Sequence, residues 1–235
     1  MKQTLVATVI CLFLGFGSHA QNTLHQPFNT LLQKYVSSAG KVDYKGLKTE
    51  KAALEAYTAD LSKNVPTTAT NKNASLAYWI NAYNAFTLKL ILDNYPVKSI
   101  TDLSGGKPWD VKFFELGGKK YSLNQIENDI VRPQYKDARI HFALNCAAVS
   151  CPPLANVAFT ETNIQEMLNA RTKSFLNNAT NNELSTEKGK VSKLFDWYKA
   201  DFGDVPTFIN KYTTTKLNAT AAIEYKEYNW RLNEK

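Results

Sequence analysis

The feature that most constrains the fold is a long segment that is apolar on almost every face of a helix. Residues 73–94 read NASLAYWINAYNAFTLKLILDN, and their apolar side chains recur around the whole circumference at helical spacing. Such a helix must be covered on most sides, so we expect it to be buried within the domain. Asn81 and Asn84 within it need hydrogen-bond partners once buried. We therefore expect each amide to bond to a loop or strand that crosses the helix.

Other segments also carry helical signals. Ser122 and Gln125 form a capping-box pattern at the start of one short helix, and Pro133 is expected to end that helix. From apolar spacing and turn residues, helices are expected over residues 22–38, 49–61, 123–131, 160 or 162 to 176, 195–202 and 206–212.

Strand signals follow the helical N-terminal part of the chain. Residues 111–116 and 119–123 flank Gly117-Gly118, which predicts a β-hairpin, and further strands are expected over 190–194 and 222–232. Residues 139–145 are too few for periodicity to decide between a strand and a helical turn. The mixture predicts an α+β fold, a single domain whose helical N-terminal part packs on a small antiparallel sheet.

The N-terminus has the pattern of an export signal. Met1-Lys2 is followed by the apolar run of residues 5–16, and then by Gly17-Ser18-His19-Ala20, which provides small residues for signal-peptidase cleavage. We expect residues 1–20 to be a signal peptide and residues 21–235 to be the mature single domain. The sequence thus predicts a secreted or periplasmic protein.

Charge and motif content exclude several functions. The chain has 28 Lys and Arg against 21 Asp and Glu, a formal charge of +7, and loss of Lys2 leaves +6 (7 − 1). The basic residues are dispersed, so no nucleic-acid partner is expected. Residues 21–235 contain no run long and apolar enough for a stable membrane span. No glycine-rich phosphate loop or metal-ligand spacing is present, so no cofactor is expected. The oligomeric state stays open.

The segment most suggestive of chemistry is residues 139–154, RIHFALNCAAVSCPPL. It contains Cys146, Cys151 and His141, the histidine expected to lie well inside the fold. In one interpretation His141 is a base, oriented by Glu127 or Asn145 as in a catalytic triad, and a cysteine is the nucleophile. Cys151 is favoured, because on a strand Cys146 would point away from His141. This predicts a hydrolase or acyl-transferase acting on a peptide or cell-envelope amide or ester.

The alternative interpretation is structural. Paired cysteines of exported proteins usually form disulfides, so Cys146 and Cys151 would bridge and His141 would be a core residue. The protein would then be a non-enzymatic binding module for a small molecule, a peptide or a glycan. Glu127 has a structural interpretation of its own, in which it pairs with Arg132 or Arg139. A third version keeps a His141–Glu127 site that activates water or Ser150.

Several motifs together resemble one known family. They cover most of the expected mature chain in order: Val42-Asp43-Tyr44, residues 78–85 (YWINAYNA), Ser122-Leu123 with Ile126-Glu127, residues 139–147 (RIHFALNCA), residues 150–154 (SCPPL) and residues 228–233 (YNWRLN). The chain resembles the family catalogued as domain of unknown function 547. One departure is Asn229, where the family more often has an aspartate. The resemblance implies a shared fold and names no reaction.

Export is directly testable. When the full chain is expressed with its N-terminus in a host that exports proteins, the mature protein is expected to begin at Gln21, because the small residues before it suit signal peptidase. N-terminal sequencing of the exported protein checks this. Recovery of the protein only in the cell interior, with residues 1–20 still attached, would contradict the prediction.

Overall fold

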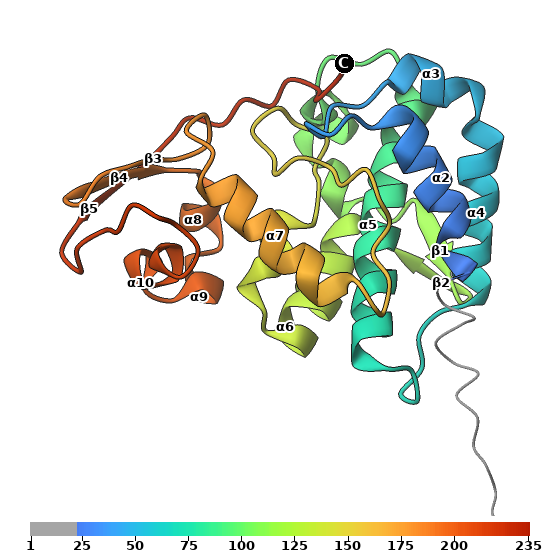
Figure 1. The fold of residues 1–235 in the computed structure, drawn as a ribbon. Coiled ribbons are helices and arrows are strands. Elements are labelled where there is room, and N and C mark those ends of the chain that lie inside the picture. Colours follow the sequence, from blue (N-terminus) through green and yellow to red (C-terminus); the bar gives the residue numbers. More distant parts are fainter. Residues whose placement is uncertain (1–22) are drawn as a thin grey trace, which may run out of the picture.

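The computed structural model describes residues 23–235, so the predicted signal peptide lies outside the described residues. Helix α5 (Lys72–Asn94) extends through the larger of two hydrophobic clusters (Figure 1). Most of its side chains are buried. It contacts α3 (Tyr44–Thr49), α4 (Lys51–Lys63), α7 (Ile164–Leu176) and residues 125–131. The predicted buried helix is therefore confirmed.

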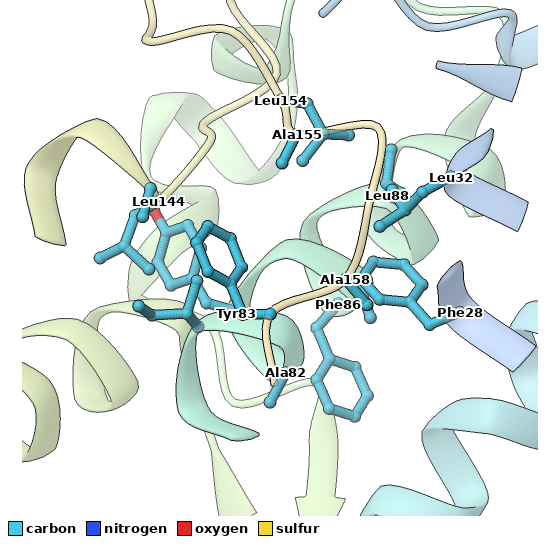
Figure 2. Packing of buried hydrophobic residues seen from close by; sticks show 14 of the residues in the cluster. Phe28, Leu32, Ala82, Tyr83, Phe86, Leu88, Leu144, Leu154, Ala155 and Ala158 are labelled. Atoms are coloured by element: carbon cyan, nitrogen blue, oxygen red, sulfur yellow. The ribbon is translucent and has the colours of Figure 1, made fainter. Parts of the chain in front are cut away.

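The N-terminal half is helical, as expected. Helix α2 (Gln26–Tyr35) packs against α3 and α4. Figure 2 shows side chains of α2 and α5 gathering around the segment that precedes α7, all within the larger cluster; those labelled include Phe28, Ala82, Leu154 and Ala158. This packing buries the apolar faces of both helices, which is the main contribution to their stability.

The predicted hairpin is also present. Strand β1 (Phe114–Leu116) pairs antiparallel with β2 (Lys119–Tyr121), and β1 packs on α4. Gly117 and Gly118 join the strands with φ of +57° and +78°, which suits a tight turn with two left-handed residues. Three short 3₁₀ turns, η1 (Ile100–Asp102), η2 (Ser104–Gly106) and η3 (Pro108–Asp110), lead into this hairpin.

Between the hairpin and α7 the chain is coiled without a long regular element. The predicted capping box, in which Ser122 and Gln125 bond reciprocally to each other's backbone amides, starts a helical segment that continues as the π-helix η4 (Gln125–Val131). The prediction for Pro133 was wrong. The chain continues as α6 (Arg132–Tyr135), because proline in the first turn of a helix removes no intrahelical hydrogen bond. Residues 138–142 form the 3₁₀ helix η5 (Ala138–Phe142) rather than a strand.

The C-terminal part forms the second hydrophobic cluster. Helices α8 (Leu194–Trp197), α9 (Lys199–Phe202) and α10 (Val205–Asn210) lie beside the strands β3 (Glu183–Leu184), β4 (Lys188–Val191) and β5 (Ala222–Tyr225), at the opposite end of the molecule from α2–α4 (Figure 1). β3, a strand that the sequence did not indicate, pairs antiparallel with β4. β4 and β5 pair parallel, because α8–α10 form a crossover between them. The α+β fold is confirmed.

The expected final strand is only partly regular. After β5 the chain continues as an extended tail, residues 226–235, which returns to the larger cluster through isolated bridges. The Val149 amide donates to the Arg231 carbonyl (2.8 Å), and the Asn233 amide donates to the Ala147 carbonyl (3.0 Å). The tail therefore lies beside the loop that carries both cysteines, residues 143–153, which we call the cysteine loop.

The two buried amides of α5 bind crossing segments, as expected. Asn81 donates to the Phe159 carbonyl (2.7 Å) and accepts from the Phe159 amide (3.0 Å). Asn84 donates to the Ala143 carbonyl (3.0 Å) and accepts from the Asn145 amide (2.9 Å). Each amide group thus satisfies one donor and one acceptor of a loop that has no secondary-structure partner there.

His141 is not the only buried histidine. His25 is 1% exposed, and its Nδ1 lies 2.8 Å from the Tyr57 hydroxyl. Burial lowers the pKa of His25 to about 4, so its ring is neutral at physiological pH. Its position just before α2 gave no sign of this burial, since a polar residue at a helix start is usually exposed.

Replacing Asn81 tests the role of these amides. Asn81→Ala is expected to lower the free energy of unfolding by about 2–4 kcal/mol, because it leaves the buried N–H and C=O of Phe159 without partners. Denaturant unfolding measures the change. Asn94→Ala, at the exposed end of the same helix, is the matched control and should cost less than about 1 kcal/mol. Equal losses in the two variants would contradict the proposed role.

Candidate functional site

A pocket of about 280 Å³ lies where the two hydrophobic clusters meet. Tyr83 and Leu144 in its lining belong to the larger cluster, and Leu194 belongs to the second. His141, Glu127, Cys146 and Cys151 also line it, together with aromatic side chains that include Trp109, Trp197, Tyr228 and Trp230. Three of the four catalytic residues predicted from the sequence therefore face one cavity.

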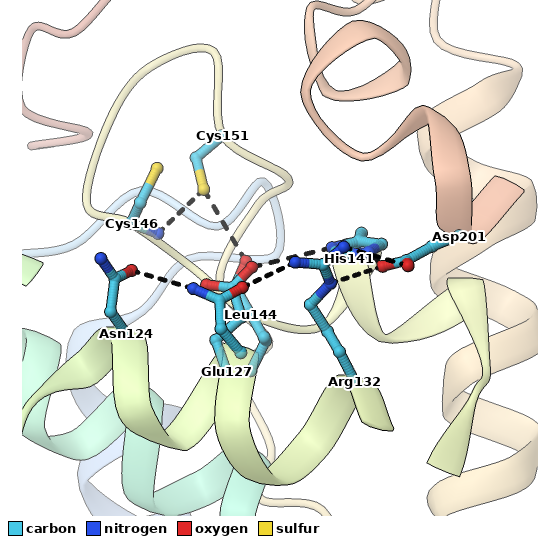
Figure 3. A network of polar contacts seen from close by, with 9 residues as sticks. Asn124, Glu127, Arg132, His141, Leu144, Cys146, Cys151 and Asp201 are labelled. Atoms are coloured by element: carbon cyan, nitrogen blue, oxygen red, sulfur yellow. Dashed lines mark hydrogen bonds and ion pairs between the residues drawn. The ribbon is translucent and has the colours of Figure 1, made fainter. Parts of the chain in front are cut away.

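The imidazole of His141 lies between two carboxylates (Figure 3). Its Nε2 is 2.7 Å from Oδ2 of Asp201, and its Nδ1 is 3.8 Å from Oε1 of Glu127. The ring stacks on Tyr198, with centroids 3.9 Å apart, and is almost completely buried. Ile140 packs in the larger cluster and Phe142 in the second, so η5 positions His141 at their boundary.

Asp201 is a site residue that the sequence did not indicate. It lies on α9, 60 residues from His141, and no local pattern distinguishes it from a surface aspartate. Arg132 also binds it in a bidentate manner, with Nε and Nη2 at 2.6 and 3.0 Å. The hydrogen bond with His141, followed by those from Arg132, holds the pKa of Asp201 well below its usual value. Asp201 therefore stays ionised.

Glu127 is buried and faces His141 from η4. The predicted pairing of Glu127 with Arg132 or Arg139 was wrong. Arg132 binds Asp201, and Arg139 binds Asp137, so each of these half-buried arginines is paired with another carboxylate. Burial and then the negative charge of Glu127 raise the pKa of the neighbouring Tyr198. Apart from His141, no cationic side chain among residues 23–235 forms an ion pair with this carboxylate.

Cys146 and Cys151 are free thiols in the structure, so the disulfide of the structural interpretation is not formed. The Sγ of Cys151 accepts from the backbone amide of Cys146 (2.8 Å) and also lies 3.8 Å from the Leu144 carbonyl (Figure 3). The Sγ of Cys146 lies 3.1 Å from the Tyr228 hydroxyl. The tail thus brings a hydroxyl group to a thiol that is 82 residues away.

The two thiols differ electrostatically. Burial raises the pKa of the Cys146 thiol, but hydrogen bonds from Cys151, Tyr228 and the Ala148 amide outweigh burial and lower it overall. Burial, and then the hydrogen bond and charge of Cys146, raise the pKa of Cys151. Cys146 is also the more exposed of the two. Cys146 therefore has the greater thiolate character at neutral pH.

Asn145 shapes the cysteine loop and does not bond to His141. Its Nδ2 donates to the Pro152 carbonyl (2.8 Å), and its Oδ1 accepts from the Ala147 amide (3.0 Å). Ala147 has φ of +60°, a conformation that is unfavourable for a residue with a Cβ atom. Asn145 therefore stabilises a strained turn immediately after Cys146.

Ser150, the third nucleophile considered from the sequence, lies outside the pocket lining. Its Oγ accepts from the Asn229 amide (2.9 Å) and so binds the tail to the loop. No group of three or more His, Cys, Asp and Glu side chains within residues 23–235 is arranged to hold a metal ion.

Comparison with known proteins identifies the family. Residues 67–176 match the family model described as "Protein of unknown function, DUF547". The resemblance is confirmed over these residues, which form a DUF547 region. Neither the curated proteins nor the solved structures yield a match. The matched DUF547 residues include Glu127, His141 and both cysteines, whereas Asp201 and Tyr228 lie beyond them. In the described part of the chain, no helix has the length and apolar character needed to cross a bilayer.

The Asp201 contacts predict a pH-dependent stability. Its folded pKa lies below the unfolded value of 3.8, so ionised Asp201 stabilises the fold above that pH and loses this effect as the pH falls below it. Asp201→Asn should therefore lower the free energy of unfolding by about 1–3 kcal/mol at pH 7. The difference from wild type should shrink as the pH falls below about 4.

Urea unfolding at pH 7, 5 and 3.5 measures this difference. Asp196→Asn is the matched control, because Asp196 is an exposed aspartate whose ion pair within residues 23–235 is with Lys193, and it should contribute less than about 1 kcal/mol. A difference between wild type and Asp201→Asn that is the same at all three pH values would contradict the assigned ion pairs.

Proposed function

We propose that the protein is a thiol-dependent hydrolase or acyl-transferase with Cys146 as its nucleophile. The observation that carries the proposal is the environment of this thiol: it lines a pocket, its pKa is lowered, and the pocket also holds a histidine between two carboxylates. Perturbed titratable groups that converge on one cavity favour catalysis over a purely structural role. The proposal assigns to Cys146 the role that the sequence favoured for Cys151.

Hydrogen-bond donors would activate the thiol. Tyr228, Cys151 and the Ala148 amide all stabilise a negative charge on the Cys146 sulfur. The pKa of Tyr228 is raised, first by burial and then by the charges of the two cysteines, so its hydroxyl keeps its proton and can donate it in a hydrogen bond. This arrangement needs no direct bond from His141 to the thiol, and hydrogen bonds to the charged form are a recognised way to lower a thiol pKa.

His141 would move protons between the two half-reactions. The Cys146 thiolate attacks a substrate carbonyl, forming a thioester and releasing an alcohol or amine, which takes a proton from protonated His141. Water, or another acceptor, then gives a proton to neutral His141 and attacks the thioester, which restores the thiolate. Asp201 fixes the ring and stabilises its charged form, while Glu127 faces the other ring nitrogen.

The expected export suggests where the substrate lies. An exported thiol enzyme of this kind would act on an amide or ester of a peptide or of the cell envelope. The alternative is a non-enzymatic binding module for a peptide or glycan, with a Cys146–Cys151 disulfide. It is favoured by one observation, the closeness of Cys151 Sγ to the Cys146 amide, because neighbouring cysteines bridge readily in an oxidising compartment.

Thiol labelling distinguishes these functions. In mature protein purified without reductant, iodoacetamide at pH 7 should modify Cys146 first, because its thiolate fraction is larger. Tyr228→Phe should slow this modification several-fold by removing one donor, whereas Tyr225→Phe, on β5 and beside Lys193, should not. Intact mass and peptide mapping give the rates. A protein with no free thiol and a mass two hydrogens lower would carry the disulfide, and the binding module would then be favoured.

Activity gives the second part of this test. Against a panel of esters and amides, Cys146→Ala should lose at least about a thousandfold in kcat/KM, because the nucleophile is gone. Cys151→Ala should keep activity within about tenfold, since it removes only one hydrogen bond to the thiolate. Full activity of Cys146→Ala on every substrate that the wild type cleaves would exclude this thiol as the nucleophile.

A further inference from the structure

Four aromatic rings form one connected group at the pocket. Trp230 lies 5.4 Å from Trp109, 5.7 Å from Trp197 and 4.5 Å from Tyr228, measured between ring centroids. They come from η3, α8 and the C-terminal tail. Trp197 is 44% exposed, which is unusual for a large hydrophobic side chain in this structure. Exposed aromatic rings that line a cavity are typical of ligand sites.

Their π faces are not taken by the protein's own cations. Side-chain cations within residues 23–235 lie over several tyrosine rings, including Arg132 over Tyr198 and Lys193 over Tyr225. In that part of the chain, none lies over Trp109, Trp197, Tyr228 or Trp230. These ring faces are therefore available to a cationic ligand. Indole rings also bind cations more strongly than phenol or phenyl rings do.

The buried charge that lines the pocket is negative. Glu127 contributes −1, while Asp201 lies outside the lining and is balanced by its ion pair with Arg132, which leaves a sum of −1 before His141 and Cys146 are considered. Moving the thiol proton to the imidazole leaves this sum unchanged, and losing it to solvent makes the sum more negative. Lys107 and Asp110 also line the pocket, but both are exposed, have opposite charges and are screened by water.

We propose that this pocket recognises an organic cation, an alkylated ammonium group seated on the tryptophan faces with Glu127 as its buried counter-charge. The inference rests on the proposed function for its substrate class: an ester or amide that carries the ammonium group close to the scissile carbonyl. A neutral sugar would also stack on these rings but would leave the buried negative charge uncompensated. A carboxylate or phosphate ligand would add to that charge.

The cation would also assist the thiol. The charge of Glu127 opposes ionisation of Cys146, so a cation that offsets this charge favours the thiolate. Substrates with the ammonium group would therefore gain in two ways, through binding on the rings and through a larger fraction of reactive thiolate. Neutral analogues of the same shape would gain only the apolar contact.

Tryptophan fluorescence with two matched probes tests the inference. Choline and 3,3-dimethylbutan-1-ol have the same shape and differ in charge, and both are titrated into the mature full-length protein. Choline should bind at least about tenfold more tightly than the neutral alcohol. Glu127→Gln should weaken choline binding several-fold without affecting the alcohol. Trp197→Ala should weaken choline binding as well, and its exposed position allows the change without unfolding. Glu115→Gln, an exposed carboxylate on β1, is the control.

Three other outcomes would overturn the inference. Equal affinity for the two probes would make the site merely apolar, and tighter binding of methyl glucoside than of choline would make it a glycan site. Absence of choline binding would also exclude an organic cation. The titration is repeated with the Cys146→Ser variant, because choline binding itself needs no reactive thiol. Choline binding there, together with no hydrolysis of any ester by the wild type, would support the cation site and reject the proposed enzyme function, so the two failures are distinguishable.

Discussion

The hydrogen bonds of Asn84 are the constraint on which the site depends. Its side chain bonds to the Ala143 carbonyl and the Asn145 amide, deep inside the larger cluster. If the cysteine loop moved away from α5, these groups would lose their partners in a place that water does not reach, at a cost of about 1–3 kcal/mol for each unpaired group. The buried helix therefore holds the loop next to Cys146 in one position, and Asn145 extends this constraint into the strained turn at Ala147.

The site also depends on the junction between the two hydrophobic clusters. His141 lies where η5 passes from one to the other, so its imidazole meets Glu127 from the larger part and Asp201 from the C-terminal part. Arg132 neutralises Asp201, which leaves Glu127 as the buried carboxylate without an arginine or lysine partner among the described residues. This uncompensated negative charge lies beside His141, which we propose moves protons, and it is the counter-charge for the cation that we infer as the ligand.

The C-terminal tail completes the pocket. It lies beside the cysteine loop through the hydrogen bond from Val149 to Arg231 and brings Tyr228 to the Cys146 sulfur. The same tail carries Trp230 to the aromatic group at the pocket. A site assembled from η4, η5, the cysteine loop, α9 and the tail needs the whole domain to be folded. The DUF547 match over residues 67–176 therefore includes the cysteines and the histidine but not all of their partners.

Local patterns in the sequence determined a good part of this protein. Apolar spacing was enough to identify α5 and its two buried amides, the glycine pair identified the hairpin, and residues 139–154 identified the region of the pocket. These features depend on neighbours within a few residues, which a periodic pattern records.

Other features were decided only by the tertiary structure: the partner of Asp201, the separation of Glu127 from both arginines, the parallel pairing of β4 and β5, and the contrast between the two thiols. Each depends on contacts between distant segments, such as the 60 residues between His141 and Asp201 and the 82 between Cys146 and Tyr228. The charge and hydrogen bonding of a buried group are set by whatever folds against it, and the chain close to that group in sequence contains no record of those neighbours.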